Sequence, residues 1–268
     1  MDLDLRDRVY LITGGTRGLG FATAASLVDE GARVVVVGRT PADVEQAQIA
    51  LGTACVGMCG DLADPQLPEL AIASAMERFD RVDGALISVG GPPPGTVLER
   101  SDADWQLAFD SIFLGTVRFA RKISQHLLDA DDSFADGGIG VTVGAPAGVI
   151  GMVLSVSVRQ SIAGLSLSNA LRPGLAMVVS DLADEVGPQG IRTFGLLPGR
   201  IATARIQQLD EASGDPVGAR ARAEAMIPLR RYGTPREFGD CAAFLLSPRA
   251  SYITGTCLAV DGGLLRMP

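Results

Sequence analysis

Thr13–Gly20, with the sequence TGGTRGLG, is the stretch that decides the fold of this 268-residue chain. It lies between an apolar run at Arg8–Thr13, which predicts a strand, and a helical pattern at Leu19–Asp29. Glycines in a strand-to-helix turn allow a tight bend and a close approach of the backbone to phosphate. The first N–H groups of the helix and its dipole then favour an anion. We expect a dinucleotide phosphate here, contacted by Gly14, Thr16, Arg17, Gly18 and Leu19.

Outward from this loop, β-branched apolar runs alternate with helical patterns. The run at Arg33–Val37 has no polar alternation, which is typical of a parallel strand buried on both faces. Further strands are predicted at Cys55–Cys59, Val82–Val89, Val149–Leu154, Ile191–Leu197 and Cys257–Val260. Helices are predicted at Pro41–Leu51, Pro65–Phe79, Asp102–Leu128 (as one helix or two), Ser161–Val186 (interrupted at Pro173-Gly174) and Pro235–Leu246. This alternation predicts an α/β fold, with one domain over residues 1–268 and a doubly wound, mainly parallel sheet.

The composition excludes several classes of protein. With 47% hydrophobic and 20% charged residues, the chain is not expected to be disordered. Its net charge of −8 leaves no basic field for nucleic acid. One histidine and four scattered cysteines offer no metal-ligand spacing, so no metal site is expected. A charged amino terminus without an apolar signal core predicts a cytoplasmic location, and the uncharged stretch Gly137–Val158 is too rich in glycine for a membrane span.

The residues after the second strand indicate which dinucleotide binds. A carboxylate at this strand end would hold the ribose hydroxyls of NAD. This chain has Gly38-Arg39-Thr40 instead. Arg39, together with Arg17 in the loop, offers two guanidinium groups to a 2′-phosphate, and Thr40 is expected to contact the cofactor beside them. NADP(H) is therefore favoured over NAD(H); the alternative is that Arg39 is only a solvated charge at the strand end.

Further motifs follow along the chain. They are Gly60-Asp61-Leu62 after the third strand, Pro198-Gly199-Arg200-Ile201-Ala202-Thr203 after the sixth, Tyr252-Ile253-Thr254-Gly255, and Val260-Asp261-Gly262-Gly263. With TGGTRGLG, this set resembles the short-chain dehydrogenase/reductase family over essentially the whole chain, especially its members similar to 3-oxoacyl carrier-protein reductases. The resemblance implies a Rossmann-like, seven-stranded sheet, a nicotinamide cofactor and a small carbonyl or alcohol substrate. It also implies a homodimer or homotetramer, paired through the helices at Asp102–Leu128 and Ser161–Val186.

The same resemblance implies further cofactor contacts. Asp61 and Leu62 are expected to border the adenine. Pro198–Thr203 is expected to border the nicotinamide, with Thr203 near its carboxamide. The complete set of contacts added in this way is Asp61, Leu62, Gly90, Arg172, Pro198, Gly199, Ile201 and Thr203.

The catalytic positions of the family are largely replaced in this chain. Family members reduce carbonyls with an Asn–Ser–Tyr–Lys set, in which Tyr donates the proton while Lys lowers the Tyr pKa and binds the ribose. Counting from the matching motifs puts Ser155 at the Ser position, Ser168 at the Tyr position, Arg172 at the Lys position and Ile112 at the Asn position. No slip of register brings a tyrosine to the Tyr position, because the three tyrosines are Tyr10, Tyr232 and Tyr252.

A second register is open for the fifth strand and its turn. It places them at Gly137–Gly148, with Ala145 at the Ser position. We prefer Ser155, because the thirteen residues between it and Ser168 match the family spacing. The preferred register leaves an insertion at about residues 129–147.

Two segments are candidates for the substrate side of the site. Gly91-Pro92-Pro93-Pro94-Gly95 follows the fourth strand, and its stiff proline run either walls the site or is only a rigid turn. Asp210–Ile227 is rich in Ala and Arg and lies where family members carry a substrate lid.

These replacements separate two hypotheses about function. An aliphatic hydroxyl such as Ser168 is far too weak an acid to replace a phenol, whose pKa is about 10. Arg172 cannot shuttle protons, but it can still hydrogen-bond ribose hydroxyls. The first hypothesis is an NADP(H)-dependent oxidoreductase in which Ser155 orients the carbonyl and either water or Ser168 supplies the proton. The second is a catalytically inactive dinucleotide-binding pseudoenzyme that senses the cofactor or supports a partner.

Overall fold

A computed structural model describes residues 2–130 and 147–266, and residues 1, 131–146 and 267–268 lie outside this description. The strands are β1 (Val9–Thr13), β2 (Arg33–Gly38), β3 (Cys55–Cys59), β4 (Gly84–Ile87), β5 (Gly148–Val153), β6 (Ile191–Pro198) and β7 (Thr256–Val260). The helices are α1 (Gly18–Asp29), α2 (Pro41–Leu51), α3 (Leu67–Phe79), α4 (Asp102–Ala108), α5 (Gly115–Asp129), α6 (Ser166–Val186), α7 (Ala204–Glu211), α8 (Pro216–Met226) and α9 (Pro235–Leu246).

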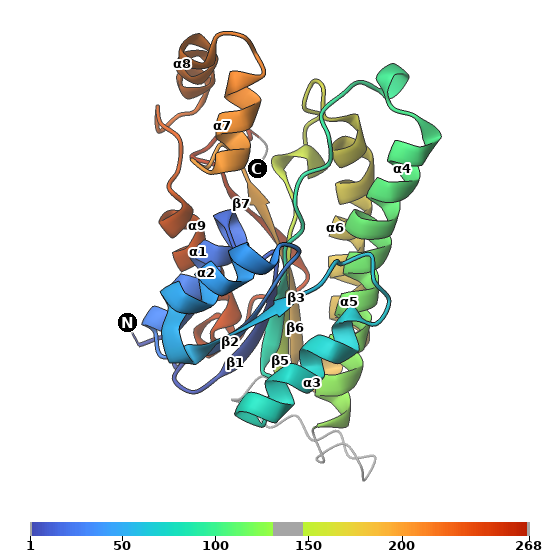
Figure 1. Ribbon diagram of the computed structural model, residues 1–268, viewed down its shortest axis with the longest axis vertical. Helices are drawn as coiled ribbons and strands as arrows, with labels where there is room; N and C mark the ends of the chain where they lie inside the picture. The colour runs from blue at the N-terminus through green and yellow to red at the C-terminus, as the bar shows by residue number, and fades with distance from the viewer. Residues whose placement is uncertain (1, 131–146, 267–268) are drawn as a thin grey trace.

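The strands form one parallel sheet in the order β3-β2-β1-β4-β5-β6-β7. Helices α1, α2 and α9 pack on one face of this sheet, and α3, α5 and α6 pack on the other (Figure 1). This arrangement confirms the predicted Rossmann-like, doubly wound, seven-stranded fold. The chain winds outward from β1 in both directions, so the crevice for a ligand is expected beyond the carboxyl ends of β1 and β4.

The fifth strand confirms one of the two registers considered for the sheet. β5 pairs with β4 on one side and with β6 on the other, so Gly148–Val153 fills the sheet position between them. The alternative strand at Gly137–Gly148 falls almost wholly outside the described residues, as do Ala145 and most of the predicted insertion at 129–147. Ser155 therefore follows the strand that occupies the fifth position.

The predicted interruption of the long helix at Pro173-Gly174 is wrong. Helix α6 runs without a break from Ser166 to Val186, with Pro173 inside it. Gly174 is explained by packing instead, because a Cβ atom there would lie 2.8 Å from Cε2 of Phe113. Phe113 belongs to a π-helical turn, Phe109–Leu114, which joins α4 to α5 in one continuous helical segment.

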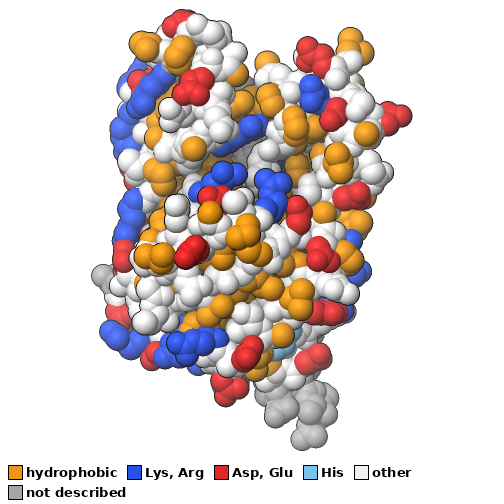
Figure 2. Space-filling view, in the orientation of Figure 1, with side chains coloured by type: hydrophobic (Ala, Val, Ile, Leu, Met, Phe, Trp, Pro, Cys, Tyr) orange, Lys and Arg blue, Asp and Glu red, His pale blue; other side chains and the backbone are white. Residues whose placement is uncertain are grey.

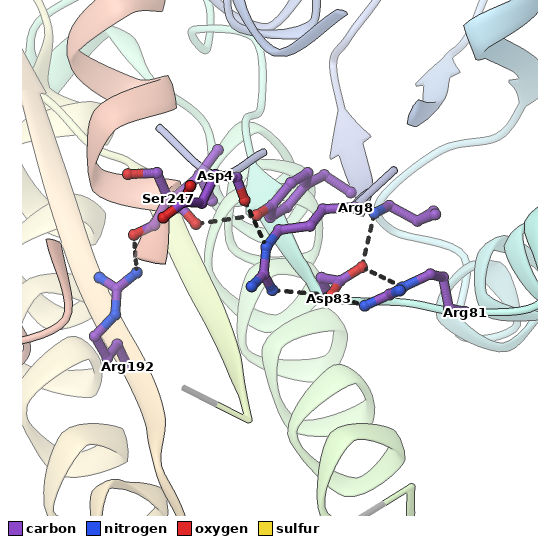
Figure 3. Close-up of polar contacts among 9 residues, drawn as sticks. Asp4, Arg8, Arg81, Asp83, Arg192 and Ser247 are labelled. Atoms are coloured by element: carbon purple, nitrogen blue, oxygen red, sulfur yellow. Dashed lines mark hydrogen bonds and ion pairs between the residues drawn. The ribbon is translucent and has the colours of Figure 1, made fainter. Parts of the chain in front are cut away.

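The amino-terminal end of the sheet carries two groups of polar contacts, one around Asp83 and one around Arg192 (Figure 3). Asp83 is buried before β4 and accepts hydrogen bonds from Arg8 Nη1 at 3.1 Å, Arg81 Nη2 at 2.6 Å and the backbone N–H of Val9 at 2.8 Å. Arg192 lies in β6 and donates to the carbonyls at the end of α9. Most of these donors and acceptors are paired within the fold, although the buried Nε of Arg192 has no hydrogen-bond partner among the described residues. This end of the sheet therefore mainly serves the fold. In the part of the chain that the structure describes, no helix is long and apolar enough to cross a membrane.

Candidate active site

The glycine-rich loop joins β1 to α1 at the centre of the sheet. Gly14 and Gly18 have φ values of +55° and +59°, which L side chains rarely adopt. A side chain on Gly14 would also collide with the next strand, since its Cβ would lie 2.7 Å from the carbonyl oxygen of Ser88. Thr13 Oγ1 donates to that carbonyl at 2.8 Å and accepts from the Ser88 N–H at 2.9 Å. The ends of β1 and β4 are thus joined below an exposed backbone turn that fits a pyrophosphate.

Two arginines flank this turn. Arg17 lies in the loop and Arg39 follows β2, and both side chains are exposed. Thr16 packs on the end of β2, because a Cβ atom on Gly38 would overlap its methyl group. Within the described residues, neither arginine has a carboxylate oxygen within 4.0 Å. Arg17, Arg39 and the exposed Thr40 therefore leave a cationic edge beside the loop.

The residues after β3 lie at the same end of the sheet but differ in exposure. Asp61 is exposed, and its Oδ1 accepts a hydrogen bond from the Ala63 N–H at 2.9 Å. Leu62 is buried in the core, where its carbonyl packs against Gly115 at the start of α5. Asp61 can therefore border a ligand directly, whereas the side chain of Leu62 mainly shapes the floor.

The segment after β6 crosses over the phosphate loop. Gly199 is held by its N–H bond to the Val260 carbonyl at 3.0 Å, and Pro198 ends the strand before it. Ile201 is buried and pairs with Gly233. The methyl group of Thr203 lies 3.9 Å from the position of a Cβ on Gly18. The predicted nicotinamide segment thus lies against the predicted phosphate loop, although the two are far apart in the sequence.

A chain of serines follows β5. Ser155 is half-buried, and its Oγ accepts a hydrogen bond from the Ser157 N–H at 3.0 Å. Ser157 Oγ lies 3.2 Å from Ser168 Oγ, and both of these side chains are buried. Nothing in the sequence pattern singled out Ser157, because only the packing of α6 against the end of β5 brings it to Ser168. The hydroxyl of Ser168 is therefore engaged by a neighbouring hydroxyl, and Ser155 keeps its own proton available for a ligand.

Arg172 lies beneath these serines and is 5% exposed. Its Nη1 donates to the Val153 carbonyl at 2.7 Å, and its Nη2 lies 3.5 Å from the Val89 carbonyl. Burial lowers the pKa of Arg172 to about 10, so the guanidinium is still charged at neutral pH. None of the described carboxylates lies within 4.0 Å of it. Ile112, at the predicted Asn position, is in the apolar core and cannot hold a water by its side chain.

The crevice is bounded by the two segments that are candidates for the substrate side. Pro92 is buried, and the loop that contains it is tied to the start of α6, where Ser166 Oγ donates to the Gly95 carbonyl at 2.7 Å. Across the crevice, α7 and α8 lie above the carboxyl ends of the strands (Figure 1). Arg205 of α7 reaches over to the Pro92 carbonyl, at 2.7 Å from its Nη2. Figure 2 shows a hollow between these walls, with Lys and Arg side chains gathered around it.

The α7–α8 segment is anchored by a buried cluster. Asp210 accepts hydrogen bonds from Tyr232 Oη at 3.0 Å and from Arg200 Nη1 at 2.9 Å. Arg220 of α8 lies over the Tyr232 ring, 4.8 Å from its centroid. One of the three tyrosines is thus part of the support of this segment, bonded to a carboxylate.

Comparison with known proteins agrees with this geometry. The model of the enoyl-(acyl carrier protein) reductase family matches residues 14–265. The short-chain reductase protein NovJ of Streptomyces niveus is 29% identical over 262 residues, which cover 96% of this chain and 94% of that protein. The 3-oxoacyl-[acyl-carrier-protein] reductase FabG of Vibrio cholerae is 25% identical, with coverage of 98% and 99%.

Solved structures show the same architecture. L-Sorbose reductase from Gluconobacter frateurii, in complex with NADPH and L-sorbose, superposes with a TM-score of 0.86 at 27% identity, over 100% of both chains. The sheet order, the loop at Thr13–Gly20 and the match at residues 14–265 all lead to one assignment. The chain belongs to the short-chain dehydrogenase/reductase family of oxidoreductases, whose fold carries a nicotinamide dinucleotide.

Proposed function

We propose that this protein is an NADP(H)-dependent oxidoreductase that interconverts a small carbonyl compound and its alcohol. The observation that carries the cofactor choice is the pair of exposed guanidiniums of Arg17 and Arg39 at the loop and the end of β2. A 2′-phosphate is the ligand group that best matches two guanidiniums at this position. The complex of the related sorbose reductase with NADPH supports the same choice.

The residues that would hold the cofactor fit its chemistry. Gly14 and Gly18 present bare backbone for the pyrophosphate, with Thr16 and Leu19 completing the turn. Asp61, Leu62 and Gly90 would border the adenosine half, and Pro198, Gly199, Ile201 and Thr203 would border the nicotinamide. When bound, the cofactor supplies or accepts the hydride. Arg172 would donate hydrogen bonds to the ribose hydroxyls, replacing the lysine of the family.

The substrate oxygen is polarised by Ser155 in this proposal. Its Oγ already accepts the Ser157 N–H, so its own proton points to a second acceptor. Ser168 is buried and shares a hydrogen bond with Ser157, which leaves it poorly placed to deliver a proton. We therefore propose water as the proton donor, with Arg172 supplying a fixed positive charge below the site. The rate is expected to be low, because a positioned general acid contributes about 10²–10⁴-fold.

Assembly and location complete the proposal. Apolar side chains lie exposed along the α4–α6 side, namely Leu107, Phe109, Leu114 and Met177. This apolar surface supports a homodimer or homotetramer paired through those helices. All four cysteines are free thiols, which supports a reducing, cytoplasmic environment.

A second candidate function is favoured by one observation. The Tyr position holds a buried serine and the Asn position holds a core isoleucine, so the proton-donating half of the family site is missing. This favours a dinucleotide-binding pseudoenzyme that senses the cofactor or supports a partner. Titration with NADPH, followed by its oxidation with a panel of ketones and quinones, separates the two. Cofactor binding without turnover on any carbonyl would favour the pseudoenzyme.

The cofactor choice has its own test in Arg39→Ala. Loss of one charge-assisted bond to the 2′-phosphate should weaken NADPH binding about tenfold or more and leave NADH binding unchanged. Fluorescence titration with both cofactors measures the effect. Arg78→Ala is the matched control, because Arg78 is an exposed arginine at the end of α3, beside Arg33 at the amino-terminal end of β2 and so at the other end of the sheet from Arg39. An equal loss for NADH and NADPH would refute the NADP(H) preference.

A further inference from the structure

The loop after β4 lies between two guanidinium groups that come from opposite sides of the crevice. Arg172 of α6 reaches the Val89 carbonyl from one side, at 3.5 Å. Arg205 of α7 reaches the Pro92 carbonyl from the other side, at 2.7 Å. The guanidinium of Arg205 also covers Gly91, since a Cβ atom there would lie 3.1 Å from its Nε. Two positive charges therefore face the same four-residue stretch at the carboxyl end of the central strand.

Arg205 differs in its partners from Arg200 and Arg100, two arginines near the crevice that have a carboxylate beside them. Arg200, five residues earlier, is paired with the buried carboxylate of Asp210 at 2.9 Å. Arg100, beside the proline loop, lies 3.9 Å from Asp104. Arg205 donates to a backbone carbonyl and has no carboxylate within 4.0 Å among the described residues. Burial lowers the pKa of Arg205, so its charge has lost part of its hydration without gaining a counter-ion.

Arg205 is placed where a bound ligand could reach it. It lies two residues after Thr203, whose methyl group is 3.9 Å from the position that a Cβ atom on Gly18 of the phosphate loop would take. It therefore projects from the predicted nicotinamide segment toward the wall opposite. A guanidinium has five N–H donors in a rigid fork, and one carbonyl bond leaves most of that fork unused. A planar anion such as a carboxylate matches this geometry with two parallel hydrogen bonds.

We infer that Arg205 is a specificity-determining residue that binds a carboxylate of the substrate, so that the preferred substrates are oxo acids and hydroxy acids rather than neutral ketones and alcohols. This inference rests on the proposed function, because it assigns the substrate class of the same site. The carboxylate would be close to the reacting carbon, since Arg205 and Ser155 face one crevice. The acidic chain, with its net charge of −8, would then attract an anion only through this local cluster of arginines.

The test compares acids with their methyl esters on the full chain saturated with NADPH. Wild type should favour the oxo acid over its ester in kcat/KM. Arg205→Gln should lower kcat/KM for the acids about 10- to 100-fold and leave the esters within about threefold, because one charge-assisted pair is lost. Arg249→Gln is the matched control: it removes one positive charge from the segment after α9, where Arg249 is exposed and paired with Asp4. It should change neither class.

The alternative role of Arg205 is a strap that only holds α7 against the proline loop. An equal loss for acids and esters in Arg205→Gln, or no loss, would establish the strap and overturn the inference. Failure of the proposed function shows separately, as an absence of NADPH binding or of any turnover in wild type. If wild type binds NADPH without turnover, calorimetry compares the affinities of the acid and its ester for the NADPH-saturated protein. An acid that binds no tighter than its ester would also overturn the inference.

Discussion

Arg172 and Arg192 are both buried arginines, but they serve opposite ends of the sheet. They are 5% and 4% exposed, and burial lowers the pKa of each to about 10. Arg192 donates to the carbonyls of Leu245 and Ser247 at 2.9 Å and of Ile253 at 3.3 Å, at the negative end of the α9 dipole (Figure 3). Arg172 has one short bond and one long one. Arg192 donates to three carbonyls of the fold, although its buried Nε has no partner among the described residues. Arg172 donates to two carbonyls and so keeps more bonding capacity for a ligand.

The same contrast extends to the neighbours of the two arginines. Around Arg192, the amino-terminal end also places Arg8 and Arg81 on the carboxylate of Asp83. Around Arg172, the described part of the carboxyl end offers Arg17, Arg39 and Arg205 without a carboxylate within 4.0 Å. A cation whose partners are built into the chain stabilises the fold, and a cation without them is available for binding.

The largest expected effect is on stability, from Arg192→Met. This change removes the donor to two carbonyls at the end of α9 and to the Ile253 carbonyl in the loop that follows, and should lower the free energy of unfolding by about 3 kcal/mol. Urea denaturation measures the loss, and NADPH affinity should stay within about twofold. A fall in NADPH affinity with little change in stability would contradict the assignment of this end to the fold.

A smaller effect, on cofactor affinity rather than on stability, is expected from Arg172→Met. NADPH binding should weaken by about 2 kcal/mol, or roughly 30-fold, because the proposed ribose contacts are lost. Stability should fall by less than in Arg192→Met, because Arg172 has one short and one long carbonyl bond, whereas Arg192 has three carbonyl bonds. Cofactor titration and urea denaturation of the two Met variants side by side provide the measurement. An equal loss of stability in both variants would contradict the claim that Arg192 serves the fold and Arg172 serves ligand binding.

The smallest effect is expected from Ser168→Ala. Its hydroxyl is bonded to Ser157 and lies away from the proposed proton path, so kcat/KM should stay within about threefold. Ser155→Ala is the contrasting variant and should cost about tenfold or more, because it removes the donor to the substrate oxygen. Steady-state kinetics on the best carbonyl substrate measures both. A large loss in Ser168→Ala would identify that hydroxyl as the proton donor after all.

The fold was largely predictable from local patterns. Apolar β-branched runs and the turn at Thr13–Gly20 locate β1, β2 and α1 within about one residue, because a buried parallel strand and a phosphate turn impose strict composition. The break predicted at Pro173-Gly174 failed for a tertiary reason. Gly174 is small because Phe113 packs against it, and a residue pattern within one helix cannot report the helix beside it.

The site was predictable only in part. Arg17, Arg39, Ser155 and Arg172 follow from motifs and spacing, and they remain proposals as ligand contacts. Ser157 and Arg205 carry no motif and became visible only through their partners, Ser168 and the Pro92 carbonyl. Their roles depend on contacts across 11 and 113 residues of sequence.

The sequence by itself determined the class of this protein, through the strand–helix alternation and the phosphate turn. It also predicts that no tyrosine stands where the family places its proton donor. These features are local in the chain, so composition and spacing are enough to reveal them. Only the tertiary structure decided which charged side chains are bonded to groups of the chain and which keep donors for a ligand. Arg172 and Arg192 are the same residue type at similar burial, and their difference lies in which distant carbonyls the fold brings to them. A buried charge acquires its role from its partners, and the fold alone assigns those partners.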